Sequence, residues 1–378
     1  MIDTLGFINF LKDHGVDFYC GVPDSLLSPV SAALETMSAQ KALSHYVCAN
    51  EGNAIGLACG HYLGSQTIPC VYMQNSGLGN AVNPLVSLAA PEVYGIPLLM
   101  IIGWRGEGKD EPQHVMQGRI NEGLLNVLEI PYKILDQDCQ DWSVMIADLL
   151  SIAKEHEKPV ALLVRSNTFS SYKCAQTSEH KPYMSRERAI ELVISSVSGE
   201  ETLVATTGKT SRELYELRKS RNESGASDFL TVGSMGHASQ IAAGIAINHS
   251  RKNVLCLDGD GACLMHMGGL LVTAPLSNFK HILLNNGVHD SVGGQQTVAG
   301  SFDLGPIAKA CGYKNVQQVA SEEELLKAME NYKNVEGSVF LEIMIKPGSR
   351  TDLGRPKESP QINKKRFMMQ LSNSQSEG

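Results

Sequence analysis

Short apolar runs alternate with helix-type patterns along most of the chain, and this alternation most limits the folds that it can adopt. The runs lack a polar face, which is typical of strands in a parallel sheet that helices cover on both sides. In the first half the predicted strands are residues 16–20, 42–47, 67–73, 97–102, 132–135 and 160–164. In the second half they are residues 202–205, 229–231, 254–257, 281–284, 316–319 and 339–344. The sequence therefore predicts an α/β protein of two doubly wound domains, whose ligands bind beyond the carboxyl ends of the strands.

Predicted helices lie between the strands, and two polar segments separate the chain into domains and a C-terminal arm. The predicted helices include residues 24–37, 51–63, 141–155, 186–196, 211–219, 238–248, 303–311 and 322–332. A polar stretch rich in Ser and Thr interrupts the alternation, and it predicts a linker at residues 169–184 between a first domain, 1–168, and a second domain, 185–346. Residues 347–378 are polar and contain three prolines, so we expect an extended C-terminal arm. Within and next to this arm, we expect residues 346–356 to fold over the ligand site.

Composition and charge exclude several classes of protein. Hydrophobic residues make up 43% of the 378 residues and charged residues 19%, which excludes a disordered chain or a coiled coil. The net charge of −8 disfavours nucleic acid and anionic membranes as partners. The nine cysteines are scattered without a C-x-x-C pair, as in buried, reduced thiols. The chain begins without a signal-peptide pattern, and its apolar runs are too short to span a membrane. We therefore expect a cytoplasmic protein that acts on a small molecule.

Polar residues after two consecutive predicted strands indicate a metal site. The strand at 254–257 ends in D-G-D-G at residues 258–261, and the strand at 281–284 ends in N-N-G-V at residues 285–288. One strand–helix–strand crossover sets such ends side by side, so Asp260 and Asn286, 26 positions apart, present oxygen donors at one sheet edge. Such donors suit Mg²⁺ that carries a diphosphate, and Gly259 and Gly261 allow close backbone approach. The alternative is that these residues only mark turns.

The G-D-G at 259–261 followed at this distance by N-N at 285–286 resembles the signature of thiamine-diphosphate enzymes. The resemblance implies that Asp260, Asn286 and the Val288 carbonyl hold Mg²⁺ on the cofactor's diphosphate. It makes residues 1–168 a pyrimidine-binding domain and residues 185–346 a diphosphate-binding domain, without the middle domain of many relatives. It also implies a homo-oligomer of at least two chains, because in this family the cofactor lies between domains of different subunits.

Two further motifs match the same family. Glu51 follows a predicted strand and opens a predicted helix, and it resembles the glutamate that hydrogen-bonds the cofactor's aminopyrimidine ring. The alternative for Glu51 is an acid that the helix dipole favours at a helix N-terminus. The segment G-S-M-G at 233–236 resembles the loop whose apolar residue, here Met235, bends the two cofactor rings together, while the Gly233 carbonyl accepts from the exocyclic amino group.

Residues 21–25, 74–80, 109–114 and 285–295 together resemble phosphonopyruvate decarboxylases, with sulfopyruvate decarboxylases as near neighbours. The resemblance implies decarboxylation of 3-phosphonopyruvate to phosphonoacetaldehyde and CO₂, in phosphonate biosynthesis of the 2-aminoethylphosphonate type. Asp24 and His114 resemble, by position, the acid and the imidazole that manage protons in related decarboxylases. The alternatives are a helix N-cap for Asp24 and a backbone-bonded loop histidine for His114.

A phosphonate substrate requires cations, and five basic residues are candidates. They are Arg105, Lys109, Lys209, Arg350 and Arg355. The alternative for each of them is a solvated surface charge.

Two other functions stay open from the sequence. Sulfopyruvate decarboxylase is the nearer alternative, although the fusion of both domains in one chain favours the phosphonate. A non-catalytic subunit of a larger carboligase complex is the alternative from another class.

Overall fold

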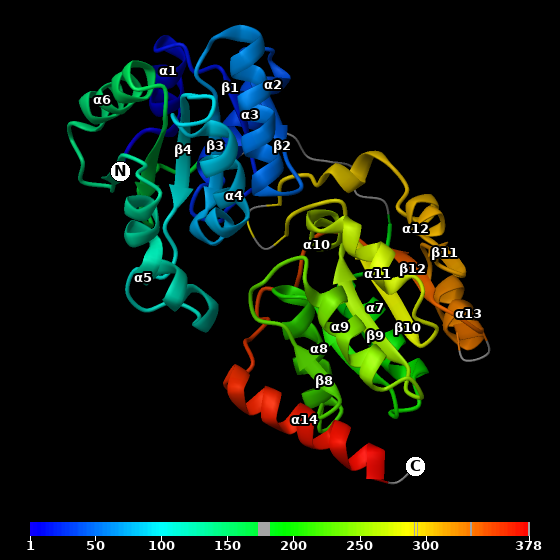
Figure 1. The fold of residues 1–378 in the computed structure, drawn as a ribbon. Helices are drawn as coiled ribbons and strands as arrows, with labels where there is room; N and C mark the ends of the chain where they lie inside the picture. The colour runs from blue at the N-terminus through cyan, green and yellow to red at the C-terminus, as the bar shows by residue number, and fades with distance from the viewer. Residues whose placement is uncertain (173–181, 291, 293, 333–334, 377–378) are drawn as a thin grey trace. The chain divides into compact units, whose positions relative to one another are not determined.

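The computed structural model describes residues 1–172, 182–290, 292, 294–332 and 335–376 (Figure 1). The chain divides into two compact units, Met1–Ser178 and Glu179–Gly378. Residues 173–181 of the predicted linker lie outside the described residues. Each unit contains a parallel sheet of six strands, which confirms the predicted α/β fold with two doubly wound sheets.

The first unit has the strand order β2-β1-β3-β4-β6-β5. Its strands are β1 (Phe18–Gly21), β2 (Ser44–Val47), β3 (Cys70–Gln74), β4 (Leu98–Gly103), β5 (Tyr132–Leu135) and β6 (Pro159–Val164). Its helices are α1 (Thr4–Asp13), α2 (Ser28–Ala39), α3 (Glu51–Ser65), α4 (Leu78–Pro84), α5 (Pro112–Val127) and α6 (Trp142–Glu155), with the short turns η1 (Asn75–Gly77) and η2 (Leu85–Ala89). The central strands carry apolar residues on both sides because helices cover both faces.

Strand β4 shows how the sheet is buried. Leu99 and Ile101 pack into a cluster with apolar residues of α1, α2 and α6. Met100 and Ile102 pack into a second cluster with residues of α3 and α4. All four side chains are fully buried, and successive residues of a strand point to opposite faces. The continuous apolar run in the sequence therefore reflects two hydrophobic cores on one sheet.

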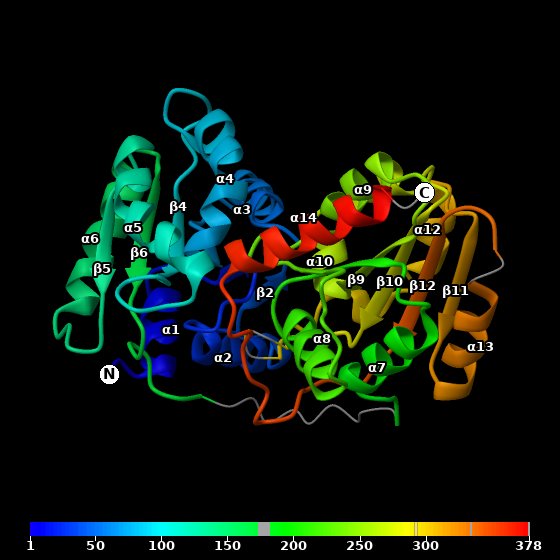
Figure 2. The same cartoon turned by 90° about the horizontal axis from the view of Figure 1, so that it is seen from below.

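The second unit has the strand order β11-β12-β10-β9-β7-β8. Its strands are β7 (Thr202–Ala205), β8 (Asp228–Leu230), β9 (Val254–Gly259), β10 (Phe279–Asn285), β11 (Asn315–Val319) and β12 (Val339–Met344). Its helices are α7 (Arg186–Ser196), α8 (Lys209–Ser220), α9 (Ala238–Asn248), α10 (Asp260–Met265), α11 (Leu270–Thr273), α12 (Gly305–Cys311), α13 (Glu322–Tyr332) and α14 (Pro360–Ser376), with the turns η3 (Met267–Gly269) and η4 (Val298–Ser301). Figure 2 shows α7, α8 and α13 on one face of this sheet and α9 and α12 on the other.

The end of the chain differs from the expectation. Residues 347–359 contain no regular element, but Pro360–Ser376 form α14, so the predicted extended arm is wrong beyond residue 359. Phe367, which is 4% exposed, packs against Phe229 of β8 at a ring distance of 5.4 Å. Asn363 donates to the Asp228 carbonyl at 3.0 Å and accepts from the Leu230 amide at 3.2 Å. A polar helix of this kind gains its stability from tertiary packing, which a local pattern does not reveal.

Within the described ranges, no helix combines the length and apolar character needed to cross a membrane.

Candidate active site

The functional candidates of the first unit follow the carboxyl ends of four strands that are neighbours in the sheet. Asp24 follows β1, Glu51 follows β2, and Arg105 follows β4. The segment after β3 lies between them in the sheet order and provides η1 and α4. Gln74 at the end of β3 contacts Asp24, Asn75 of η1 contacts the Arg105 backbone, and Asn80 of α4 contacts Glu51. The end of β3 and the segment after it therefore join the three residues into one polar cluster.

Glu51 is the first residue of α3 and is 5% exposed. Asn50 precedes it as the N-cap and accepts from the Gly52 amide at 2.7 Å, so the helix begins at Glu51. Asn80 Nδ2 donates to Glu51 Oε2 at 2.7 Å. Burial raises the pKa of Glu51, although the hydrogen bond from Asn80 lowers it in part. The side chain is therefore a buried acid that carries its proton to a higher pH than an ordinary glutamate.

Asp24 is completely buried. Its Oδ1 accepts from Gln74 Nε2 at 2.7 Å, and its Oδ2 accepts from the Leu26 amide at 3.0 Å. Burial raises the pKa of Asp24 against these two hydrogen bonds and the charge of Arg105. The carboxyl group also packs closely against the backbone of Gly103. A Cβ at this position would lie 2.0 Å from Asp24 Oδ2, so a larger residue does not fit there.

Arg105 lies beside this carboxyl group. Its Nη1 donates to Ser25 Oγ at 3.1 Å, and its Nε and Nη2 form a bidentate pair with Asp110 at 2.8 and 2.7 Å. This pair holds the pKa of Asp110 well below its usual range. Lys109 is exposed next to Asp110. His114 is half-buried in the first turn of α5, and its backbone packs against Gly106, where a Cβ would lie 1.9 Å from the His114 carbonyl oxygen.

In the second unit, β9 and β10 are paired in parallel, and Asp260 follows directly after β9. Asp260 is 3% exposed, and Thr297 donates to its Oδ2 at 2.6 Å. Burial raises the pKa of Asp260 to about 6, against hydrogen bonds from Thr297 and from backbone amides that include Gly261 and Asn286. The Asn286 amide therefore contacts this carboxylate, as expected for residues at adjacent strand ends.

Asn286 and Val288, in the segment that follows β10, offer further oxygen atoms. Asn286 Oδ1 accepts from the Val288 amide at 3.1 Å, while its Nδ2 donates to Asp290 Oδ2 at 2.8 Å. The Val288 carbonyl accepts from the Asp290 amide at 3.1 Å. Each of the two acceptor oxygens has a second lone pair. A carboxylate, an amide oxygen and a carbonyl match the ligands that Mg²⁺ prefers, so the residues present fit the metal that the resemblance implies.

The glycines around Asp260 differ in the space that they leave. A Cβ at Gly259 would have no atom within 4 Å, so that side of the strand end is open. A Cβ at Gly261 would lie 3.3 Å from Met235 Cε and 2.9 Å from His289 Cε1. The structure thus brings the 233–236 loop, α10 and the segment after β10 together. Ser234 in this loop has φ +46°, which is strained for a residue other than glycine.

The remaining cation candidates lie in the second unit. Lys209 is the first residue of α8 and is half-buried. Arg350 is paired with three carboxylates, those of Glu187, Glu216 and Asp352. Arg355 is exposed in the segment before α14. These three residues belong to a different unit from Arg105 and Lys109.

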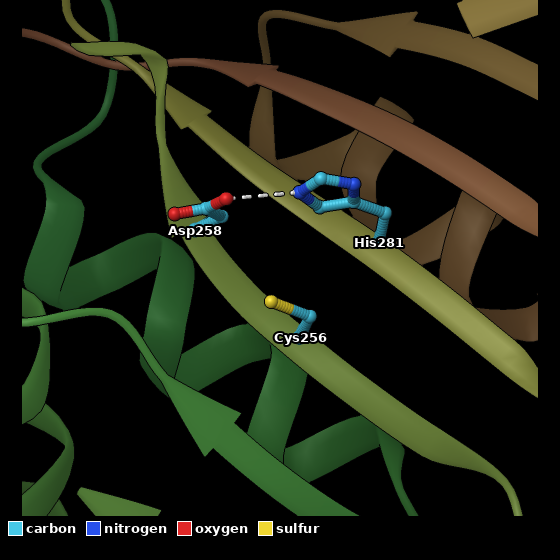
Figure 3. Close-up of side chains that lie close together, drawn as sticks. All are labelled: Cys256, Asp258 and His281. Atoms are coloured by element: carbon cyan, nitrogen blue, oxygen red, sulfur yellow. Dashed lines mark hydrogen bonds and ion pairs between the residues drawn. The ribbon is translucent and has the colours of Figure 1, made fainter. Parts of the chain in front are cut away.

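Figure 3 shows a second cluster, formed by side chains of the neighbouring strands β9 and β10 in the second unit. Cys256, Asp258 and His281 are fully buried, and one ligand atom from each lies within 4.8 Å of the others. His281 contacts Asp258 Oδ2 at 3.2 Å through Nε2 and Tyr313 Oη at 3.2 Å through Nδ1. Burial raises the pKa of the Cys256 thiol, which disfavours the thiolate that a metal needs. We therefore interpret this cluster as a hydrogen-bonded link between β9 and β10.

Sequence reasoning missed the polar partners of the candidate residues. They are Gln74, Asn80, Asp110, Thr297, His289 and Asp290, with Arg186 behind Asp290. Gln74 and Asn80 stand in a segment that the resemblance already used, and Thr297 and Asp290 follow the N-N-G-V motif. Burial lowers the pKa of His289 to about 4, so this imidazole is neutral at pH 7.

Two models of known protein families match the chain. The model described as the N-terminal TPP binding domain of thiamine pyrophosphate enzymes matches residues 6–125. The model described as the C-terminal TPP binding domain of the same enzymes matches residues 206–343. Together with the two doubly wound sheets, these matches show that the chain belongs to the thiamine pyrophosphate enzymes.

Relatives place the chain more narrowly within this class. The phosphonopyruvate decarboxylase of Streptomyces viridochromogenes is 34% identical, over 97% of this chain and 94% of its own length. The sulfopyruvate decarboxylase of Methanosarcina acetivorans is 28% identical, over 95% of each chain. A sulfopyruvate decarboxylase subunit beta from Methanothermobacter thermautotrophicus is 37% identical, over 44% of this chain and 84% of its own. The chain is thus a member of the decarboxylase family that contains the phosphonopyruvate decarboxylases.

The fusion of both domains in one chain, which the sequence analysis uses in favour of a phosphonate substrate, is also found in a relative named for sulfopyruvate. The Methanosarcina acetivorans relative, which is named for sulfopyruvate, aligns over the same full length. Fusion therefore does not distinguish the two activities.

Proposed function

We propose that this chain catalyses the thiamine-diphosphate- and Mg²⁺-dependent decarboxylation of 3-phosphonopyruvate to phosphonoacetaldehyde and CO₂, as a step in phosphonate biosynthesis. The observation that carries the proposal is the buried Asp260 carboxylate at the end of β9, in contact with the backbone of Asn286 beyond the end of β10. The preference for a phosphonate is supported by the higher identity of the phosphonopyruvate decarboxylase relative, 34% against 28%.

Three residues would hold the metal and the diphosphate. The Asp260 carboxylate supplies the negative charge, and the Asn286 amide oxygen and the Val288 carbonyl complete the set of hard oxygen ligands. Gly259 leaves open space at the strand end. In this proposal Met235, whose Cε lies against Gly261, supports the cofactor rings, and the Gly233 carbonyl accepts from the aminopyrimidine.

Glu51 would act on the aminopyrimidine. When bound, thiamine diphosphate supplies the carbon nucleophile and the electron sink that make loss of CO₂ possible. A protonated Glu51 would donate a hydrogen bond to a ring nitrogen of the aminopyrimidine and so hold the proton that this ring needs. The raised pKa of Glu51 suits this role, because an ordinary glutamate has lost its proton at pH 7.

The substrate would lie near Asp24, Arg105 and His114. Asp24 is a buried carboxyl group whose raised pKa lets it hold a proton, and His114 supplies an imidazole on the neighbouring helix. Arg105 and Lys109 form the favoured phosphonate site, because Arg105 contacts Ser25 directly after Asp24. Among the candidates of the second unit, Arg350 ranks lower because it already pairs with three carboxylates, whereas Lys209 and Arg355 stay candidates.

The assembly and the location of the enzyme are part of the same proposal. We propose a cytoplasmic homo-oligomer of at least two chains. Sedimentation equilibrium is expected to give at least twice the chain mass of 40.9 kDa. A monomer that is active at assay concentration would contradict this part of the proposal.

CO₂ release by the purified enzyme with thiamine diphosphate and Mg²⁺ tests the reaction. We expect kcat/KM to be highest for phosphonopyruvate, lower for sulfopyruvate and lowest for pyruvate. A higher value for sulfopyruvate would favour that rival activity, and equal values for pyruvate would contradict a cationic substrate site. No CO₂ release from any of the three would favour a non-catalytic carboligase subunit.

Substitution of the metal ligand provides the matched test. Asp260→Ala is expected to abolish CO₂ release through loss of the metal and the cofactor. Asp228→Ala is the control, because Asp228 is buried and paired with Arg218 at 2.8 and 3.1 Å on β8, which β7 separates from β9 in the sheet. Full turnover by Asp260→Ala would show that the metal assignment is wrong.

A further inference from the structure

A buried arginine at the start of α7 joins two carboxylates of the second unit. Arg186 donates to Glu213 of α8 through Nε and Nη2, at 2.8 and 3.1 Å. Its Nη1 donates to Asp290 Oδ2 at 3.0 Å. The exposed fractions of these side chains are 6% for Arg186, 1% for Glu213 and 10% for Asp290. The buried arginine is thus the shared hydrogen-bond donor and charge partner of both carboxylates.

Asp290 also contacts Asn286, whose amide oxygen is proposed to bind the metal. Asn286 Nδ2 donates to Asp290 Oδ2 at 2.8 Å, and Asn286 Oδ1 accepts from the Val288 amide at 3.1 Å. An ionised carboxylate only accepts hydrogen bonds, so Asp290 selects the NH₂ side of the amide. The amide oxygen is thereby kept on the opposite side, where a metal can reach its second lone pair.

The first residues of the C-terminal arm complete this arrangement. The Gly348 amide donates to both carboxylate oxygens of Asp290 at 3.0 Å, and the Gly348 carbonyl accepts from Arg186 Nη2 at 3.3 Å. Gly348 has φ +100°, a conformation that favours glycine. Two residues later, Arg350 pairs with Glu187 of α7 and Glu216 of α8. Figure 2 shows the arm running past these two helices before it reaches α14.

We propose that Asp290 is a positioning residue for the metal ligand Asn286, and that Arg186 and Gly348 hold Asp290 in place. The inference rests on the proposed metal role of Asn286. Groups that orient a metal ligand typically change metal affinity by about 10- to 100-fold when they are lost. The first residues of the C-terminal arm thus belong to the support of the metal site, although they do not touch the metal themselves.

Manganese binding to the full-length protein tests the proposal without relying on turnover. Mn²⁺ replaces Mg²⁺, thiamine diphosphate is saturating, and the free Mn²⁺ signal is followed by electron paramagnetic resonance. Asp290→Asn is expected to raise the half-saturating Mn²⁺ concentration by about tenfold or more. The amide introduced at position 290 offers one acceptor oxygen in place of two. Its NH₂ group can also donate to the Asn286 oxygen and so turn the Asn286 amide around.

Asp228→Asn is the matched control. Asp228 is 2% exposed and forms a bidentate pair with Arg218 at 2.8 and 3.1 Å in the same unit. This variant removes the same kind of buried charge without touching Asn286, so its Mn²⁺ half-saturation should stay within about twofold of wild type. An equal loss of Mn²⁺ affinity in both variants would show general destabilisation and overturn the proposal.

A second variant covers the case in which Asp290→Asn does not fold. Arg186→Lys keeps the charge but loses the planar fork, so it cannot contact Glu213, Asp290 and the Gly348 carbonyl together, and we expect about a threefold to tenfold weaker Mn²⁺ affinity. Wild-type Mn²⁺ affinity in a folded Asp290→Asn or in Arg186→Lys would overturn the proposal. If Asp260→Ala binds Mn²⁺ as wild type does, the metal site itself is wrong and this inference falls with it.

Discussion

At the scale of single residues, the first unit contains two buried carboxyl groups that are each held by an amide side chain. Asn80 donates to Glu51, and Gln74 donates to Asp24, at 2.7 Å in each case. Burial raises the pKa of both carboxyl groups, and groups of this kind concentrate at functional sites. Gln74 ends β3 and Asn80 lies in α4, so one continuous stretch of chain provides the hydrogen-bond donors to both acids.

Glu51→Gln tests the proposed proton-holding role. Glutamine keeps the size of the side chain and accepts from Asn80, but it has no acidic proton. We expect CO₂ release at saturating cofactor to fall by at least about 100-fold, with little change in the half-saturating concentration of thiamine diphosphate. A turnover close to that of wild type would show that Glu51 only begins α3.

Asp24→Asn tests the raised pKa of the completely buried carboxyl group through stability. The unfolded aspartate loses its proton at about pH 4, whereas the native one holds it to higher pH. The contribution of this group to stability is therefore fully present below about pH 4 and is lost as the pH rises through the raised native pKa. Asparagine does not ionise, so the stability of the variant relative to wild type should rise as the pH increases from about 4 through the raised native pKa. Urea unfolding at several pH values measures this difference, and a constant difference would contradict the prediction.

At the scale of elements, η1 and α4 act as the wall against which Glu51 packs. A Cβ at Gly77 would lie 2.4 Å from Glu51 Oε1, whereas a Cβ at Gly79 would have no atom within 4 Å. The short turn after β3 therefore approaches the acid closely enough that only glycine fits. Asn80 lies in α4, so the same segment provides both the contact surface and the hydrogen bond.

Gly77→Ala and Gly79→Ala form a matched pair for this element. The first variant displaces Glu51, and we expect at least about a tenfold loss in kcat, since small misplacements of catalytic groups are costly. The second variant places alanine on the open side of a helix and should keep wild-type activity and stability. Equal activity of the two variants in the CO₂ assay would contradict the close packing around Glu51.

Helix α14 covers the strand at one edge of the second sheet. β8 stands at the end of the strand order, and Asn363 bonds both its Asp228 carbonyl and its Leu230 amide. An exposed edge strand pairs readily with other chains, so the helix also protects the protein against association. The charged and polar sequence of α14 is thus consistent with a helix that contacts the protein along one stripe.

Phe367→Ala tests this docking. Phe367 is 4% exposed, so its loss should weaken the docking of α14 by about 3 kcal/mol or more. Hydrogen exchange of residues 360–376 should become much faster, while Met368→Ala, at a side chain that is 57% exposed, should leave it unchanged. Unchanged exchange in Phe367→Ala would mean that other contacts hold α14.

At the scale of the whole molecule, the chain consists of two units that each have a sheet and a core of their own. Glu51 and the Asp260 cluster belong to different units, so the proposed reaction requires both. A relative named as a subunit aligns with 44% of this chain, so the two units can be tested as separate chains.

Co-expression of residues 1–172 and 182–378 as two chains tests this idea. We expect the two chains to copurify and to regain CO₂ release, because each unit buries its own apolar surface and residues 173–181 carry no candidate site residue. Each chain alone should release no CO₂. A copurified but inactive pair would show that a continuous chain is necessary.

Some elements of this fold can be predicted from a short stretch of sequence, and others cannot. β4 and β9 were predicted because each is a continuous apolar run bounded by polar or turn-forming residues. The adjacency of Asp260 and Asn286 followed from the crossover rule, which needs only the order of the elements. α5, which positions His114, was not predicted, because its apolar residues do not form a continuous stripe and its buried face contains Gly118 and Asn121.

Local pattern and chain order are enough to predict the two sheets, the strand ends that carry acidic and amide residues, and the family. The hydrogen bonds from Asn80 to Glu51 and from Thr297 to Asp260, and the docked helix after residue 359, become visible only in the folded chain. Such partners lie tens of residues apart, and hydrogen bonding between buried polar groups depends on packing that no short stretch of sequence encodes.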